Sequence, residues 1–124
     1  MPNLVIVGPG GIGRAIAREH SARGWGITLV GRSAERLAVA ATECPGAHTL
    51  VADPTDVDTL PTCASTLLEF RPNGFHAVVC SVGSVALQPA HRMNGASWRA
   101  VMTANLDAAF ATLRLAVELL PQGG

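Results

Sequence analysis

The chain has 124 residues, enough for one domain with a single hydrophobic core. Its nine arginines balance nine aspartates and glutamates, so the formal net charge is zero. This balance argues against a nucleic-acid-binding protein, in which a surplus of positive charge neutralises the phosphates. No uncharged apolar run is long enough to cross a bilayer, and no charged leader precedes an apolar signal segment. We therefore expect a cytoplasmic protein with no membrane partner.

The reactive side chains narrow the chemistry further. The three cysteines, Cys44, Cys63 and Cys80, are odd in number and widely spaced, which predicts free thiols and no metal site. The sequence contains neither tyrosine nor lysine. Any chemistry that these residues perform must use other side chains.

Apolar runs alternate with helical patterns along the chain. In chain order, the expected elements are a strand over 3–7, a helix over 12–23, a strand over 27–30, a helix over 34–42, a strand over 48–52, a helix over 55–70, a strand over 75–80 and a long helix over 98–120. Gly24 is expected to end the first helix, and Ser33, Thr55 and Ser97 to cap the later ones.

Strands that alternate with helices at this spacing form βαβ units and a parallel sheet. We predict one α/β domain over residues 1–124, a Rossmann-like, doubly wound parallel sheet. Its four strands are expected in the order 3-2-1-4, with helices on both faces.

The turn after the first strand carries the strongest motif. Residues 8–13, Gly-Pro-Gly-Gly-Ile-Gly, match G-x-G-x-x-G at Gly8, Gly10 and Gly13. The first glycine permits a tight turn, the second lets the backbone approach a pyrophosphate, and the third lets the helix pack close to the sheet. The phosphates would lie at the helix N-terminus, where unpaired N–H groups favour negative charge. The alternative is a tight structural turn without a ligand.

The end of the second strand indicates which dinucleotide binds. Folds that prefer NAD, FAD or S-adenosylmethionine often have an acidic residue there, which accepts the ribose hydroxyls. This chain has Gly31-Arg32-Ser33, and the Arg32 guanidinium could bind a 2′-phosphate, with Ser33 as a second donor. The sequence therefore favours NADP(H) over NAD(H) and disfavours S-adenosylmethionine. The alternative is an ordinary solvated arginine.

Four segments together resemble the short-chain dehydrogenase/reductase family, along essentially the whole chain but over only the N-terminal half of that family's domain. They are Val5–Ala17, Leu29–Ser33, Val51–Asp53 and Trp98–Asn105. The resemblance implies an oxidoreductase that transfers hydride between a nicotinamide cofactor and a carbonyl or alcohol substrate. The site residues that it implies are Gly8, Gly10, Gly11, Ile12 and Gly13 at the pyrophosphate, Arg32 and Ser33 at the 2′-phosphate, Asp53 at the adenine, Gly83 near the nicotinamide ribose, and Asn105 as a catalytic, proton-relay residue.

The sequence departs from the family pattern in three places. Gly8 and Gly11 enclose two residues instead of three, and the family's Asn-Asn-Ala-Gly appears as Cys-Ser-Val-Gly over residues 80–83. The family's fifth strand, catalytic serine and Tyr-x-x-x-Lys pair have no counterpart, because the chain stops at residues 121–124. We expect a sheet truncated before the fifth strand and a chain that is inactive on its own. The alternative function is a non-catalytic nucleotide-binding module, a sensor or a truncated remnant.

The last predicted helix has an unusually wide apolar surface. Its polar side chains form a narrow stripe made of Arg99, Thr103, Asp107, Arg114 and Glu118. Asn105 falls on the opposite, apolar side, where a satisfied structural asparagine is the alternative to a catalytic role. The surplus apolar surface predicts either a homo-oligomer formed through residues 98–120 or a face left bare by missing strands.

Overall fold

A computed structural model describes residues 1–121 of the chain, so residues 122–124, where the sequence ends, lie outside the described residues. The strands are β1 (Asn3–Val7), β2 (Gly26–Gly31), β3 (His48–Val51) and β4 (Ala77–Cys80). The α-helices are α1 (Gly11–Ala22), α2 (Ala34–Thr42), α3 (Ala64–Phe70), α4 (Gly95–Met102) and α5 (Ala108–Leu119). Two short 3₁₀ turns, Leu60–Cys63 and Ala90–Arg92, and a π-helical segment, Thr103–Asp107, complete the elements.

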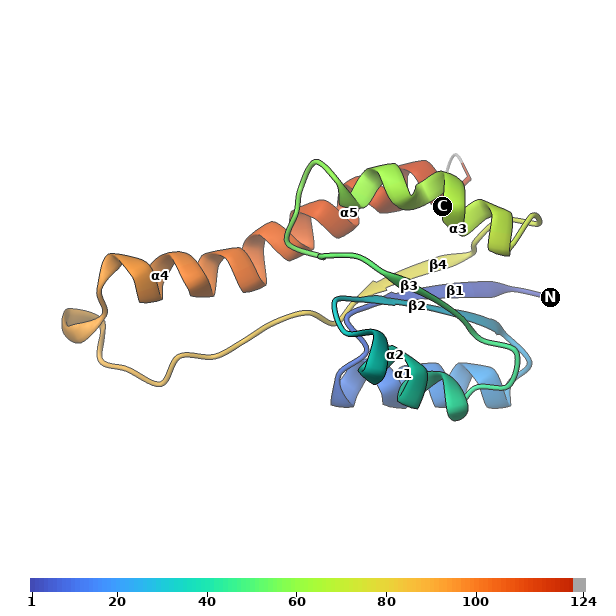
Figure 1. Ribbon diagram of the computed structural model, residues 1–124, viewed down its shortest axis with the longest axis horizontal. Coiled ribbons are helices and arrows are strands. Elements are labelled where there is room, and N and C mark those ends of the chain that lie inside the picture. The colour runs from blue at the N-terminus through green and yellow to red at the C-terminus, as the bar shows by residue number, and fades with distance from the viewer. Residues whose placement is uncertain (122–124) are drawn as a thin grey trace.

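The described strands form one parallel sheet of four strands in the order β3-β2-β1-β4, which confirms the predicted topology. β1 lies in the centre, with Val5 opposite Thr28 of β2 and Val78 of β4. Figure 1 shows α1 and α2 on one face of the sheet and α3 and α5 on the other. All four strands therefore end at the same edge, next to the glycine-rich turn.

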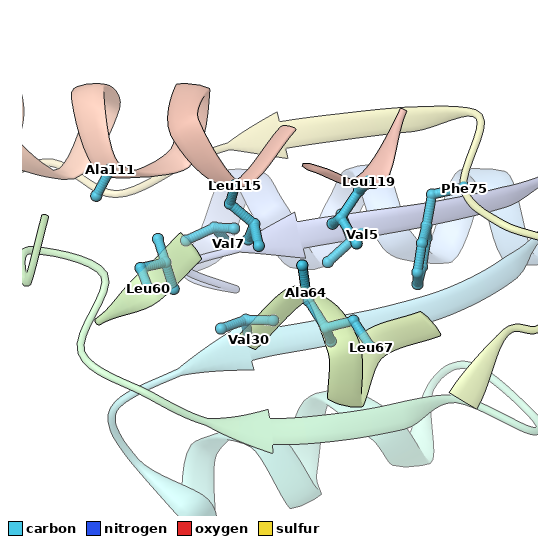
Figure 2. Close-up of a cluster of buried hydrophobic side chains, with 10 residues drawn as sticks. All are labelled: Val5, Val7, Val30, Leu60, Ala64, Leu67, Phe75, Ala111, Leu115 and Leu119. Atoms are coloured by element: carbon cyan, nitrogen blue, oxygen red, sulfur yellow. The ribbon is translucent and has the colours of Figure 1, made fainter. Parts of the chain in front are cut away.

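The alternation of side chains along β1 divides the core into two layers. Val5 and Val7 face the first layer, which α3 and α5 cover with Leu67, Leu115 and other side chains (Figure 2). Leu4 and Ile6 face the second layer, which α1 and α2 cover. The burial of β1 on both faces explains why its sequence is an unbroken apolar run.

The helix predicted over 55–70 begins later than expected. The Asp53 carboxylate accepts hydrogen bonds from the Thr55 N–H at 2.9 Å and the Thr55 hydroxyl at 2.7 Å, so Thr55 does not cap a helix. Asp56 likewise accepts from the N–H groups of Asp58 and Thr59. These side chains compete with helical hydrogen bonding, and the segment stays a turn until the 3₁₀ turn at Leu60.

The remaining helix ends are partly as predicted. Ser33 caps α2, and Gly24 follows the end of α1 with a positive φ of 87°. Asn94, however, caps α4 in place of Ser97: the Ser97 N–H donates to Asn94 Oδ1 at 2.9 Å. The helix therefore begins three residues earlier than the sequence predicted, because an asparagine can cap as well as a serine.

The last helical stretch, Gly95–Leu119, has one covered face and one open face. Ala108, Ala111 and Leu115 are buried against the sheet, whereas α4 extends beyond the sheet (Figure 1). The predicted surplus of apolar surface is present: the exposed apolar side chains here are Trp98, Leu106, Phe110, Leu113 and Val117. By length and composition alone this stretch could also cross a membrane, a criterion that core helices of globular proteins meet as well.

A pair of leucines on α5 tests this assignment of the two faces. Leu115 is fully buried and Leu113 is 64% exposed. Leu115→Ala should lower the free energy of unfolding by about 2–5 kcal/mol, because it leaves a cavity in the layer of Figure 2. Leu113→Ala, the matched control, should change it by less than about 0.5 kcal/mol. Urea unfolding of both variants measures the difference, and equal effects would contradict the packing.

Candidate functional site

A cavity of about 740 Å³ lies at the carboxyl ends of the strands. Its walls come from the glycine turn, the β2–α2 junction, the segments that follow β3 and β4, α4 and the start of the π-helical segment. The lining residues are Gly8–Gly10, Gly31–Ser33, Arg36, Leu37, Pro54, Thr55, Ser81–Ser84, Arg99, Ala100, Thr103 and Ala104. No aspartate or glutamate among the described residues lines it, whereas Arg32, Arg36 and Arg99 do. The cavity is therefore suited to an anionic ligand.

Two glycines of the turn are required by packing within the chain. Gly8 has a φ of +82°, and a Cβ there would collide with the side chain of Val82. Gly13 is buried at the start of α1, where a Cβ would lie 2.6 Å from Ser81 Oγ and 2.8 Å from the Gly8 carbonyl oxygen. Glycine at position 8 therefore permits the tight turn, and glycine at position 13 permits the close approach of α1 to the sheet.

The other two glycines of the turn have no such requirement. A Cβ at Gly10 or Gly11 would meet no atom within 4 Å, and Gly10 has an ordinary φ of −78°. Gly10 is the N-cap of α1 but has no side chain to bond the free N–H groups of the first turn. The result is an open cradle of backbone at a helix N-terminus, and it fits the pyrophosphate of a dinucleotide.

The residues predicted to select the ligand lie on the same cavity. Arg32 and Ser33 follow β2 and both line the wall. Ser33 Oγ accepts a hydrogen bond from the Arg36 N–H at 3.2 Å, and its own hydroxyl hydrogen remains free to donate. Ser33 can therefore cap α2 and contact a ligand at the same time.

Asp53 lies at the expected place, after β3, but its carboxylate is bonded within its own loop. Both hydrogen bonds that the Asp53 carboxylate accepts come from Thr55, and Pro54 and Thr55 line the cavity in its place. The carboxylate therefore holds the loop, and Thr55 forms part of the cavity wall. The sequence pattern gave no sign of Thr55 as a wall residue.

Ser81 is a site residue that the sequence analysis did not single out. Its hydroxyl donates to the Gly8 carbonyl oxygen at 2.7 Å, and its N–H donates to the Val7 carbonyl oxygen at 2.9 Å. It joins the end of β4 to the glycine turn. The signal that could have revealed it is its place in the family's Asn-Asn-Ala-Gly segment.

Asn105 lies in the π-helical segment and is bonded to backbone. Its amide nitrogen donates to the carbonyl oxygens of Ser84 at 2.9 Å and Val101 at 2.8 Å, and its oxygen accepts from the Ser84 N–H at 3.2 Å. Because the side chain takes the Val101 carbonyl, the helix widens, and the Ala108 N–H donates to Thr103 five residues back. Asn105 thus ties the helix to the Gly83–Ser84 loop, where a Cβ at Gly83 would lie 2.9 Å from Asn105 Oδ1.

A smaller hollow of about 410 Å³ lies on the other side of the turn, between α1 and α2. Arg14 lines it but is engaged, with Arg18, in ion pairs with Glu43. Hydrogen bonds from Arg14 and Arg18 lower the pKa of the Glu43 carboxyl, so it stays ionised at neutral pH. Arg14 is therefore neutralised. Elsewhere in residues 1–121, no three His, Cys, Asp or Glu side chains gather into a group that could hold a metal ion.

Comparison with known proteins identifies the family to which this chain is similar. The sequence model of the family described as short chain dehydrogenase matches residues 3–124. Among curated proteins, none matches the chain.

Solved structures match over almost the whole chain. A short-chain dehydrogenase/reductase from Brucella melitensis, titled glucose/ribitol dehydrogenase, is 30% identical with a TM-score of 0.86, covering 96% of this chain and 52% of its own. A 3-ketoacyl-ACP reductase from Sinorhizobium meliloti is 29% identical with a TM-score of 0.87, covering 99% and 50%. A short-chain dehydrogenase/reductase from Mycobacterium marinum is 23% identical with a TM-score of 0.86, covering 95% and 49%.

The chain spans about half the length of these matched structures. The family match nevertheless extends over nearly every residue, from β1 through the last helix. The glycine turn, the parallel sheet and the sequence match agree. The chain belongs to the short chain dehydrogenase family.

Proposed function

We propose that the chain is the NADP(H)-binding portion of a short-chain dehydrogenase/reductase-type oxidoreductase, which acts by hydride transfer on a carbonyl or alcohol substrate. The observation that carries this proposal is the open cradle at Gly10 and Gly11, two glycines that packing within the chain does not require. Membership of an oxidoreductase family implies a nicotinamide dinucleotide as the ligand. The preference for NADP(H) rests on Arg32 and on the lack of a cavity-lining acid in the described residues.

Each part of the cofactor has residues that would hold it. The N–H groups of Gly11, Ile12 and Gly13 would bind the pyrophosphate at the start of α1. Arg32 and Ser33 would bind the 2′-phosphate, and the segment after β3, with Asp53 fixing its shape, would contact the adenine. Gly83 would lie beside the nicotinamide ribose, since its loop forms the wall near α4. The bound nicotinamide would supply or accept the hydride.

The residues of this chain would orient the cofactor rather than transfer protons. All of the Asn105 amide contacts with described residues go to backbone groups, so we assign Asn105 a positioning role at the Gly83–Ser84 loop. With no tyrosine or lysine, the sequence lacks the acid pair of the family. The second candidate function is a non-catalytic nucleotide-binding module. In both proposals the protein is soluble and cytoplasmic.

Substituting Gly10 tests whether the cradle binds the pyrophosphate. Gly10→Val should lower the free energy of unfolding by no more than about 1 kcal/mol, because the backbone is extended and the space is open, and the cost is only that of a poorer N-cap. It should weaken NADPH binding by at least about tenfold, because the side chain would occupy the ligand's place. Thermal unfolding and fluorescence titration measure the two effects.

Gly13→Ala is the contrasting variant. Its Cβ would press on the Gly8 carbonyl oxygen, so the free energy of unfolding should fall by about 1–3 kcal/mol. A Gly10→Val protein that is stable and still binds NADPH with wild-type affinity would refute the cradle as the pyrophosphate site.

The preference for the phosphorylated cofactor is tested at Arg32. Wild type should bind NADPH more tightly than NADH, and Arg32→Ala should remove most of that preference by weakening NADPH alone, roughly tenfold or more. Arg23→Ala is the control, because Arg23 is a surface arginine paired with Glu19. Equal affinities for the two cofactors, unchanged by Arg32→Ala, would contradict the assignment of Arg32.

Turnover separates the two candidate functions. Oxidation of NADPH with a panel of ketones by the 124-residue chain, lost in Gly10→Val, would contradict the non-catalytic proposal. Binding without turnover supports it for these residues, because the sequence supplies no tyrosine to protonate the carbonyl.

A further inference from the structure

The nine arginines divide into three groups by their partners. Those in ion pairs with described carboxylates are Arg14, Arg18, Arg23 and Arg114. Arg71 instead donates to the carbonyl oxygens of Ile27 at 3.0 Å and Gly46 at 3.2 Å. The remaining arginines make neither an ion pair nor a side-chain hydrogen bond within residues 1–121. They are Arg32, Arg36, Arg92 and Arg99, and all of these except Arg92 line the large cavity.

Arg36 stands out within the third group because of its position. It is the third residue of α2, and its N–H donates to the capping Ser33 hydroxyl. Side chains on a helix lean toward its N-terminus, so an arginine at this position can reach the β2–α2 junction that carries Arg32. Both residues line the large cavity, and Arg36 follows Arg32 by four positions.

Arg36 also lines the smaller hollow, together with Pro9–Gly11 on the glycine turn. It is thus the one arginine that borders both spaces among the described residues. Arg14, on the opposite wall of the smaller hollow, is paired with Glu43. Glu35, which is next to Arg36 on α2, also lines the smaller hollow but makes no ion pair with Arg36. Arg36 remains available to an anion held between the turn and α2.

The first turn of a helix is an unfavourable place for a cation, because the helix dipole favours negative charge there. An exposed arginine at this position, whose side chain makes no ion pair with any residue of 1–121, does not stabilise α2 electrostatically. A bound anion would reverse this effect, since the guanidinium and the helix N-terminus would then act on the same charge.

We infer that Arg36 is a specificity-determining residue that binds the 2′-phosphate of the cofactor together with Arg32. The inference rests on the proposed NADP(H) site and adds a residue to it. Two guanidinium groups can bond more of the three terminal phosphate oxygens than one planar fork can reach, so both arginines would contribute to discrimination against the unphosphorylated cofactor.

The test uses the 124-residue chain and two fragments of the cofactor, 2′,5′-ADP and 5′-AMP, which differ only in the 2′-phosphate. Isothermal titration is carried out on wild type, Arg36→Leu, Arg36→Lys, Arg32→Ala and the control Arg23→Leu. Arg36→Leu should weaken 2′,5′-ADP binding roughly tenfold and leave 5′-AMP binding within about twofold. Arg36→Lys should lie between wild type and Arg36→Leu, because lysine keeps the charge but loses the planar fork.

The possible outcomes distinguish a failure of the inference about Arg36 from a failure of the proposed NADP(H) site. If wild type prefers 2′,5′-ADP, Arg32→Ala removes the preference and Arg36→Leu behaves like Arg23→Leu, the role of Arg36 is refuted while the NADP(H) site stands. If wild type binds both fragments equally, the 2′-phosphate site is refuted, and the role of Arg36 with it. Arg36 is exposed, so both variants should unfold at the wild-type temperature, which a thermal melt verifies.

Discussion

The contact between the end of β4 and the glycine turn determines the shape of the site. Ser81 donates its hydroxyl to the Gly8 carbonyl oxygen at 2.7 Å, and Val82 packs where a Cβ at Gly8 would lie. On the other side of β1, the Gly8 N–H donates to the Val30 carbonyl oxygen at 2.8 Å. The turn is thus fixed by both neighbours of the central strand. Gly10 and Gly11 project from this rigid base with their backbone open, which is the arrangement that a pyrophosphate site requires.

The distribution of charge completes the site in a way that net charge conceals. The chain is neutral overall, yet three of its carboxylates, Glu19, Glu43 and Asp58, pair with arginines away from the cavity. The arginines without such partners in residues 1–121 lie mostly at the cavity wall. A neutral protein can therefore present a cationic pocket, because no aspartate or glutamate of the described residues lines the wall that these arginines share.

Sequence periodicity predicted the strands, the strand order and the family correctly, because unbroken apolar runs and glycine spacing are local signals. It failed where short polar side chains compete for backbone groups: Asp53 and Asp56 delayed α3, and Asn94 capped α4 before Ser97. Ser81 was missed because its role depends on which segments the fold brings together, and only the fold shows that Arg36 lines the cavity. The open apolar face of α5 was predicted from its wide apolar surface.

The central claim is that a dinucleotide binds across the glycine turn with its pyrophosphate at the start of α1. An amide-resolved NMR titration of the chain with NADPH tests this directly, because it reports each backbone N–H separately. The account predicts the largest shift changes at Gly10–Gly13, with further changes at Gly31–Arg36 and Ser81–Ser84. Saturating NADPH that leaves the Gly10–Gly13 amides unshifted, or shifts only residues away from the cavity, would contradict it.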